Sequence, residues 1–133
     1  MKFMVRSNMY KASNVEFNCG NWTATSYGWW EFVKPIKDKL VFNSFNYSST
    51  TMRHQSKVSM LLDQLGIRID LDIECPDGLQ HLSSAVDFYL YKIKTLETAI
   101  AKPRTHKAKN KERAKQIELY HQKIAAIEEL IND

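Results

Sequence analysis

A basic run at residues 103–115 is the feature of this sequence with the clearest chemical meaning. The run holds six Lys and Arg residues and a single carboxylate. It lies between two segments of helical periodicity, so we expect it to form the tip and first turns of a helical hairpin. Cations at the start of a helix that ends in Glu128, Glu129 and Asp133 oppose the helix dipole.

Cationic side chains beside the free N–H groups of a helix start favour an anion such as phosphate. The alternative is a solvated loop whose lysines serve only solubility. The anion hypothesis assigns phosphate binding or neutral hydrogen bonds to Arg104, Thr105, His106, Lys107, Lys109, Asn110 and Arg113.

A second candidate anion site lies at residues 47–57, where four hydroxyl residues precede a predicted helix. Hydroxyls and free N–H groups at a helix N-terminus form a cradle for anions. Arg53 and Lys57 stand four residues apart, on one face of that helix. We predict a ligand set of Thr51, Arg53, His54 and Lys57. The alternative is an ordinary N-cap at Ser49 or Thr50, with the cations facing water.

Aromatic residues crowd the first 47 positions. Stacking faces close to cations suit nucleobases. The alternative is that these rings form the core of a sheet. Alternation along a strand places Trp29 and Trp30 on opposite faces, so one of them is expected to be exposed. The candidate base-stacking residues are Trp29, Trp30 and Tyr47.

Three carboxylates, Asp70, Asp72 and Glu74, share one face of a predicted strand. Neighbours on that face are about 6.6–6.8 Å apart, and paired carboxylates can hold Mg²⁺ for phosphodiester cleavage, with Glu31 as a further ligand. The structural alternative is a polar strand face paired with cations from a neighbouring element. Neither cysteine has a catalytic partner in sequence, so we expect no catalytic residue, cofactor or metal.

The 133 residues, 44% hydrophobic and 26% charged, suffice for one compact unit with a real core. Net charge is +4 and the isoelectric point about 9.0, which is compatible with phosphate-bearing partners. The sequence shows neither the apolar run of a signal peptide nor a stretch of 18 apolar residues. We therefore expect a cytoplasmic protein, with no membrane contact and with Cys19 and Cys75 reduced.

The predicted fold class is α+β. Residues 1–75 are expected to form an N-terminal antiparallel β-meander with a short helix, and residues 76–133 a long C-terminal α-helical hairpin. Strands are predicted at 15–18, 22–33 and 40–47, with a turn at 35–39. Apolar residues spaced as Val58, Leu61, Leu62 and Leu65 indicate a helix that Gly66 ends, and strict alternation predicts a strand over 67–74.

The hairpin is predicted from two apolar seams with steps of three and four residues. Helices of about 23–25 residues would be about 35 Å long and project beyond so small a sheet. A projecting seam commonly meets a second copy, so we expect a homo-oligomer that assembles through the C-terminal helices. The seam residues are Leu82, Val86, Tyr89, Ile93, Leu96 and Ile100 in the first helix, then Ile117, Tyr120, Ile124, Ile127 and Ile131.

The segments 27–30, 39–43 and 47–55 resemble a layout of small phage-encoded proteins. In these proteins a two-stranded element runs into a Ser-x-Thr-Thr-x-x-His segment that opens a helix, here Ser48 to His54. The overall plan is similar in architecture to phage anti-Thoeris sponges. That resemblance implies capture of a nucleotide-like immune signal between subunits, and no ligand residue is carried over from it.

These observations favour a non-enzymatic, phage-type binding protein that captures a phosphate-bearing ligand, either a nucleotide immune signal or a nucleic acid. One alternative is a protein–protein inhibitor or adaptor of a host enzyme, with the basic tip meeting an acidic patch. The other is a Mg²⁺-dependent nuclease built on Asp70, Asp72 and Glu31.

Overall fold

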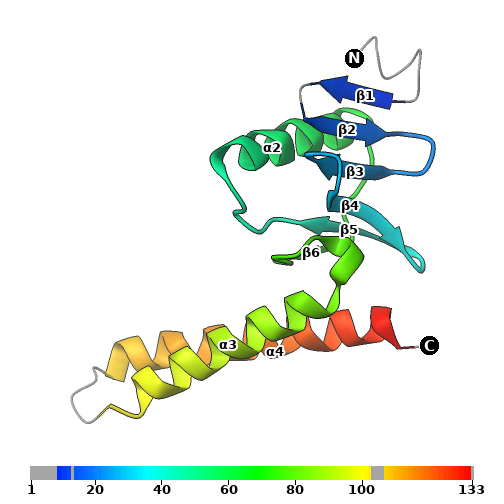
Figure 1. Ribbon diagram of the computed structural model, residues 1–133. Coiled ribbons are helices and arrows are strands. Elements are labelled where there is room, and N and C mark those ends of the chain that lie inside the picture. The colour runs from blue at the N-terminus through cyan, green and yellow to red at the C-terminus, as the bar shows by residue number, and fades with distance from the viewer. Residues whose placement is uncertain (1–8, 13, 103–106, 133) are drawn as a thin grey trace.

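The computed structural model describes residues 9–12, 14–102 and 107–132. They form an α+β fold in which an antiparallel meander is followed by helices (Figure 1). The sheet order is β1-β2-β3-β4-β5-β6, and only the β5–β6 pair is parallel. The strands are β1 (Met9–Ala12), β2 (Val15–Asn18), β3 (Thr23–Ser26), β4 (Trp30–Ile36), β5 (Lys39–Asn43) and β6 (Leu71–Ile73). The helices are α2 (Ser49–Gln64), a short 3₁₀ turn η1 (Leu79–His81), α3 (Ser83–Ile100) and α4 (Lys107–Ile131).

A β-bulge in β4 concentrates aromatic residues in the core. Ala24 pairs with Val33 and Thr25 with Glu31, so Phe32 is the extra residue on β4. The bulge lets Trp30, Phe32 and Val33 all be buried, although strict alternation would expose one of two neighbours.

One face of the sheet packs against α2. The buried stripe Val58, Leu61 and Leu62 meets side chains from β2 to β5, including Phe17 and Phe42. This is the amphipathic stripe that the sequence predicts, and burying it stabilises α2 where its intrinsic propensity would not suffice. Leu65 is the C-cap and Gly66 follows with φ of 72°, so the predicted helix end is confirmed.

The helical hairpin packs against the β5–β6 end of the sheet and extends past it (Figure 1). Val41 and Ile73 face the hairpin, whereas Leu40 and Phe42 on the same strand as Val41 face α2. Strand β5 is therefore shared by two cores. Most of the predicted seam lies in the hairpin interior, in which Tyr89, Ile93 and Ile124 are buried. Ile131 is an exception at 46% exposure, and Leu130 is the buried residue at that end of α4.

Buried amide side chains join the two cores. Asn43, fully buried, donates from Nδ2 to Cys75 O at 2.8 Å and accepts from Cys75 N at 2.9 Å. Gln55 donates to Asn43 O at 2.7 Å and to Phe45 O at 3.0 Å. Both amides bind backbone groups that the sheet leaves unpaired, which stabilises the chain where it departs from the strands.

Several predicted strand boundaries are wrong. The segment 22–33 contains a turn, because Tyr27 and Gly28 adopt positive φ values and separate β3 from β4. The turn expected at 35–39 is confined to residues 37–38, and the strand expected over 40–47 ends at Asn43. Strand β1 was not predicted.

The strand predicted at 67–74 is reduced to Leu71–Ile73. Its alternation of burial is real, but Ile67 and Ile69 pack on the α2 core while Leu71 and Ile73 pack on the hairpin core. Asp70 Oδ2 accepts a hydrogen bond from Leu40 N at 2.8 Å. The Asp70 side chain thus uses a backbone donor of β5 just before β6 begins.

Candidate functional site

The described part of the basic run, residues 107–115, forms the first turns of α4, as the sequence predicts. Lys107, Lys109 and Lys111 are exposed there, and the first turn of α4 holds no acidic residue, so its charge opposes the helix dipole. Arg113 is half-buried and donates from Nη1 to Asn110 Oδ1 at 3.1 Å, which orients its guanidinium. Of the predicted tip residues, Arg104, Thr105 and His106 lie outside the described residues.

The predicted cradle at the start of α2 is partly an interior network. Ser48, not Ser49 or Thr50, is the N-cap, and its Oγ accepts from Thr51 N at 3.1 Å. Thr51 is fully buried and His54 is 8% exposed. Ser26 Oγ lies 3.1 Å from Thr51 Oγ1 and 2.7 Å from His54 Nδ1. Thr51 and His54 therefore attach α2 to β3 and are not placed to contact a ligand in solvent, which corrects their predicted role.

Arg53 and Lys57 remain on the outer side of α2. Arg53 is exposed and Lys57 half-buried, and both line a shallow hollow of about 580 Å³ with Met52 and Met60. The first turn of α2 contains no acidic residue. This side of α2 is therefore electropositive near the helix N-terminus, where the helix dipole adds to the charge of Arg53.

Three exposed aromatic rings gather beside the start of α2: Tyr27 at 40%, Trp29 at 47% and Tyr47 at 45% exposure. We call these three residues the aromatic patch. The ring centroids of Trp29 and Tyr47 are 6.0 Å apart in an edge-on arrangement, and those of Tyr27 and His54 are 6.0 Å apart. The patch thus joins the β3–β4 turn, the segment before α2, and α2 itself.

Trp30 is not part of the exposed platform, because it is fully buried. Its Nε1 donates to Pro76 O at 2.9 Å, and its ring centroid lies 5.3 Å from that of Tyr47. Trp30 therefore supports Tyr47 from beneath. The third exposed ring of the patch is Tyr27, which the sequence analysis did not select, and not Trp30. The sequence signal for Tyr27 was its position before Gly28, since a large ring in a tight turn is often left exposed.

The turn that carries Trp29 is fixed by Gln80 of η1. Gln80 Oε1 accepts from Glu31 N at 3.0 Å, and Gln80 Nε2 donates to Trp29 O. The Gln80 side-chain amide thus binds the backbone of Trp29 and of Glu31, the two neighbours of Trp30, in place of a strand partner. These bonds restrain the backbone that carries Trp29.

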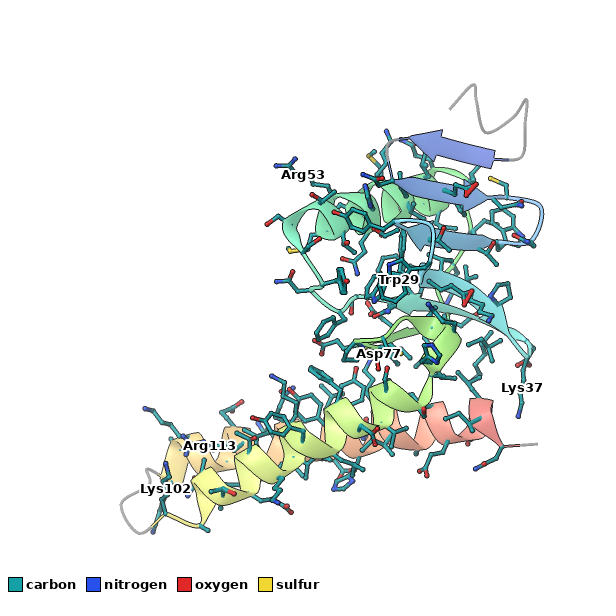
Figure 2. The ribbon with its side chains drawn as sticks, in the orientation of Figure 1. Trp29, Lys37, Arg53, Asp77, Lys102 and Arg113 are labelled. Carbon is teal, nitrogen blue, oxygen red and sulfur yellow. The ribbon has the colours of Figure 1, made fainter. Side chains whose placement is uncertain are left out.

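The aromatic patch contacts α2 through Tyr27 and His54, the residue after Arg53, whereas the basic half of α4 (Lys107, Lys109, Lys111, Arg113 and Lys115) lies apart on the hairpin. Figure 2 shows Arg53 at the outer end of α2 and Arg113 on the projecting end of the hairpin, with Trp29 between the levels of the two. Within one chain, the two predicted basic sites are therefore separate surfaces.

Two of the predicted carboxylates, Asp70 and Glu31, have local structural partners. The Asp70 carboxylate accepts from Leu40 N, and Lys123 of α4 donates from Nζ to the backbone oxygen of Asp72. Glu31 pairs with Lys34 at 3.3 Å. Among the described residues, no group of three or more His, Cys, Asp or Glu is arranged to hold a metal ion. The predicted alternative was a polar strand face paired with cations from a neighbouring element, and the structure places Lys123 of α4 beside β6, bound to its backbone.

Glu74 lies in a cleft of about 240 Å³ between β6 and the hairpin, lined also by Asp72, Tyr89, Gln116 and Lys123. Burial raises the pKa of the Glu74 carboxyl and outweighs the opposing charges of Lys92 and Lys123. Burial also raises the pKa of Tyr89, whose hydroxyl oxygen accepts a hydrogen bond from Glu74 N at 2.7 Å.

Cys75 is a structural thiol. It is buried, its Sγ donates to Gly78 O at 3.0 Å, and burial raises the pKa of the thiol. A raised pKa disfavours the nucleophilic thiolate at neutral pH.

Among the described residues, no helix combines the length and apolar character that crossing a membrane requires. No protein-family model, curated protein or solved structure matches this chain.

Proposed function

We propose that this protein is a non-enzymatic binding protein for a phosphate-bearing nucleotide ligand, either a nucleotide immune signal or a nucleic acid. A base stacks on the aromatic patch, and its phosphate lies toward Arg53 and the start of α2. The observation that carries the proposal is the gathering of three exposed rings beside an electropositive helix end. A phage-encoded, counter-defence role in the host cytoplasm is the setting that we propose for this activity.

The chemistry of the patch suits a base better than a purely apolar partner. Exposed Trp and Tyr rings offer π faces to any base, and each stacked base contributes about 1–3 kcal/mol. Buried Trp30 packs against Tyr47, and Tyr47 packs edge-on against Trp29, so little side-chain entropy is lost when a base stacks on them. Arg53 adds a bidentate donor for phosphate.

The proposal is tested by fluorescence anisotropy with a short fluorescein-labelled oligothymidylate of about 4 nucleotides, the low end of single-strand site sizes. Trp29→Ala is expected to weaken binding by about 1–3 kcal/mol, the value of one stacked base. Tyr91→Ala is the matched control, because Tyr91 is an exposed aromatic outside the patch. Arg53→Glu is compared in the same way with Arg68→Glu, another exposed arginine. Equal effects of target and control variants would contradict the proposal.

A host-protein partner is the second candidate function, and the exposed methionines on α2 favour it. Met52 and Met60 are nearly half-exposed and lie two turns apart, with Ser56 between them. Methionine surfaces adapt to protein partners. If Trp29→Ala leaves nucleotide binding intact while Met52→Ala abolishes the proposed counter-defence activity, the adaptor function replaces the first proposal.

A further inference from the structure

We infer that the outer face of α2 is a self-association surface, on which α2 of a second copy of this chain packs antiparallel with Ser56 at the two-fold axis. This inference does not depend on the proposed nucleotide ligand. Three features of α2 carry it: a ridge between two grooves, the symmetry of that ridge, and the charges at the two helix ends. We call the row of Met52, Ser56 and Met60 the α2 ridge.

A groove lies along each side of the α2 ridge. Its three side chains stand four positions apart and form one row, in which both methionines are nearly half-exposed. Arg53 and Lys57 belong to the next row of the helix, and the hollow of about 580 Å³ lies between the two rows, lined by α2 residues alone. On the other side, a hollow of about 640 Å³ lies between the ridge and the end of β5. Grooves of this kind accept the ridge of another helix.

The outer face of α2 is symmetric about Ser56. Met52 stands four positions before this serine and Met60 four positions after it, while Ser49 and Asp63 stand seven positions before and after it. In an antiparallel pair with its two-fold axis at Ser56, Met52 of each copy therefore lies beside Met60 of the other. Ser56 is the smallest side chain of the ridge, so the two backbones approach most closely there.

The charges of α2 suit an antiparallel neighbour better than they suit the helix itself. The first turn of α2 holds no acidic residue and the last turn no basic residue, and Asp63 lies in the last turn. An anion near a helix C-terminus opposes the helix dipole. In the antiparallel pair, Asp63 of each copy lies near the N-terminal turn of the other copy, where a carboxylate is favourable. The two-fold axis repeats this gain at both ends of the pair.

The interface is small, because it consists of one helix of 16 residues, about 24 Å long, from each copy. Methionine side chains adapt their shape to fill the grooves. Arg53 and Lys57 of both copies share one solvated rim of the pair, where salt screens their repulsion. A contact of this size lies at the low end of specific interfaces, so we expect a dimer that dissociates at about micromolar concentration.

This surface is separate from the C-terminal helices. The buried side of α2 packs in one core and the hairpin in the other, and Figure 1 shows the two elements apart along the sheet. Leu65 stands nine positions after Ser56 and therefore points away from the ridge. Contacts through α2 and contacts through the hairpin can thus be removed by different substitutions.

Disulfide trapping tests the register of the pair. Ser56→Cys is expected to form a covalent dimer under mild oxidation, because the two cysteines meet at the two-fold axis. Ser49→Cys is the matched control, since Ser49 is exposed on the same face but lies about 21 Å from its own copy along the antiparallel pair. The wild type, with Cys19 and Cys75, gives the background. Equal trapping of Ser49→Cys and Ser56→Cys would overturn the antiparallel arrangement.

Asp63→Lys separates association from folding. Within one chain the lysine is favourable at the C-terminal end of α2, so urea unfolding at low protein concentration is expected to give an equal or higher midpoint. In the dimer it places a cation near the other copy's helix start, so the dissociation constant from analytical ultracentrifugation is expected to rise about tenfold. Glu97→Lys is the matched control, the same charge reversal at an exposed residue in the last turn of α3, with an expected change of about twofold or less.

Equal changes in the dissociation constant for Asp63→Lys and Glu97→Lys would overturn the pairing of helix ends. If Leu90→Lys, a substitution on α3, abolishes trapping of Ser56→Cys, the dimer belongs to the C-terminal helices and the α2 interface is wrong. A wild-type monomer at every concentration, without trapping of Ser56→Cys, would also overturn it. The α2 ridge would then be left to a helix of a host protein. The proposed nucleotide binding is measured separately and stands or falls with Trp29→Ala.

Discussion

At the scale of single residues, burial separates structural groups from binding groups of the same chemical type. Thr51 and His54 fit an anion cradle by residue type, but their hydrogen bonds to Ser26 use them inside the protein. Arg53, between them in sequence, is exposed because its position on the helix differs by one or two residues. A helix that packs on a sheet therefore divides a polar cluster into an inner and an outer half.

Glu74 gives a prediction on the pH dependence of stability. Burial raises its folded pKa above the unfolded value near 4.5, so the folded state binds more protons between the two pKa values. Stability of the wild type, relative to Glu74→Gln, is therefore expected to fall as pH rises from about 4.5 through the folded pKa, and then to level off. Urea unfolding of both proteins over a pH series measures this difference. If the stability of the wild type relative to Glu74→Gln instead rises with pH, the charges of Lys92 and Lys123 outweigh burial.

At the scale of elements, the lysines at the N-terminal end of α4 oppose its helix dipole, whereas a cation from the β4–β5 turn stabilises its C-terminal end. Lys37, in the β4–β5 turn, donates from Nζ to Glu129 O at 2.6 Å and to Asn132 O. A cation at helix C-terminal carbonyls is favourable. The same contact fixes the near end of the hairpin to the sheet and leaves the basic half projecting.

Lys37→Ala is expected to destabilise the protein by about 1 kcal/mol, through the lost helix-end interaction and its hydrogen bonds. Alanine keeps the strain of the positive φ of 57° at this position, so the comparison isolates the ammonium group. Lys39→Ala, a neighbouring exposed lysine at the start of β5, is the control, with an expected change within about 0.5 kcal/mol. Chemical denaturation that gives the same midpoint for both variants would exclude the capping role.

At the scale of the whole molecule, β5 joins two cores, and the α3–α4 seam that led us to expect an oligomer is packed within the chain. Each helix covers the apolar stripe of the other, with Tyr89 and Tyr120 ring centroids 5.4 Å apart. The surface left for a second copy is smaller than the sequence implied. It includes Leu90, 50% exposed, and Leu119, 43% exposed.

Assembly through the C-terminal helices remains our prediction, and native mass spectrometry over a range of protein concentrations tests it. Leu90→Lys is expected to shift the population toward monomer, because a charge at an apolar contact costs desolvation energy. Leu65→Lys is the matched control, since Leu65 is an exposed leucine at the end of α2. A wild-type monomer at every concentration would contradict the oligomer and leave the proposed binding surfaces on a single chain.

The sequence by itself determined the helices well, because their signals are local. The apolar stripe of α2, its end at Gly66, the hairpin seams and the cations of α4 all follow from periodicity and residue type, and the structure contains them. The α+β class and the long C-terminal hairpin are confirmed for the same reason. The cationic start of α4 was likewise readable without any contact between distant residues.

Tertiary structure alone decided which residues of the candidate site are available. Alternation along the strand predicted that one of Trp29 and Trp30 is exposed, but only the tertiary structure decided that it is Trp29. The turn at Tyr27 and Gly28, which the sequence analysis did not predict, exposes Tyr27 as well. The parallel pairing of β5 with β6 placed Asp72 and Glu74 against Lys123. Such outcomes depend on pairings between residues far apart in sequence, whose free energy arises only when sheet, α2 and hairpin pack together.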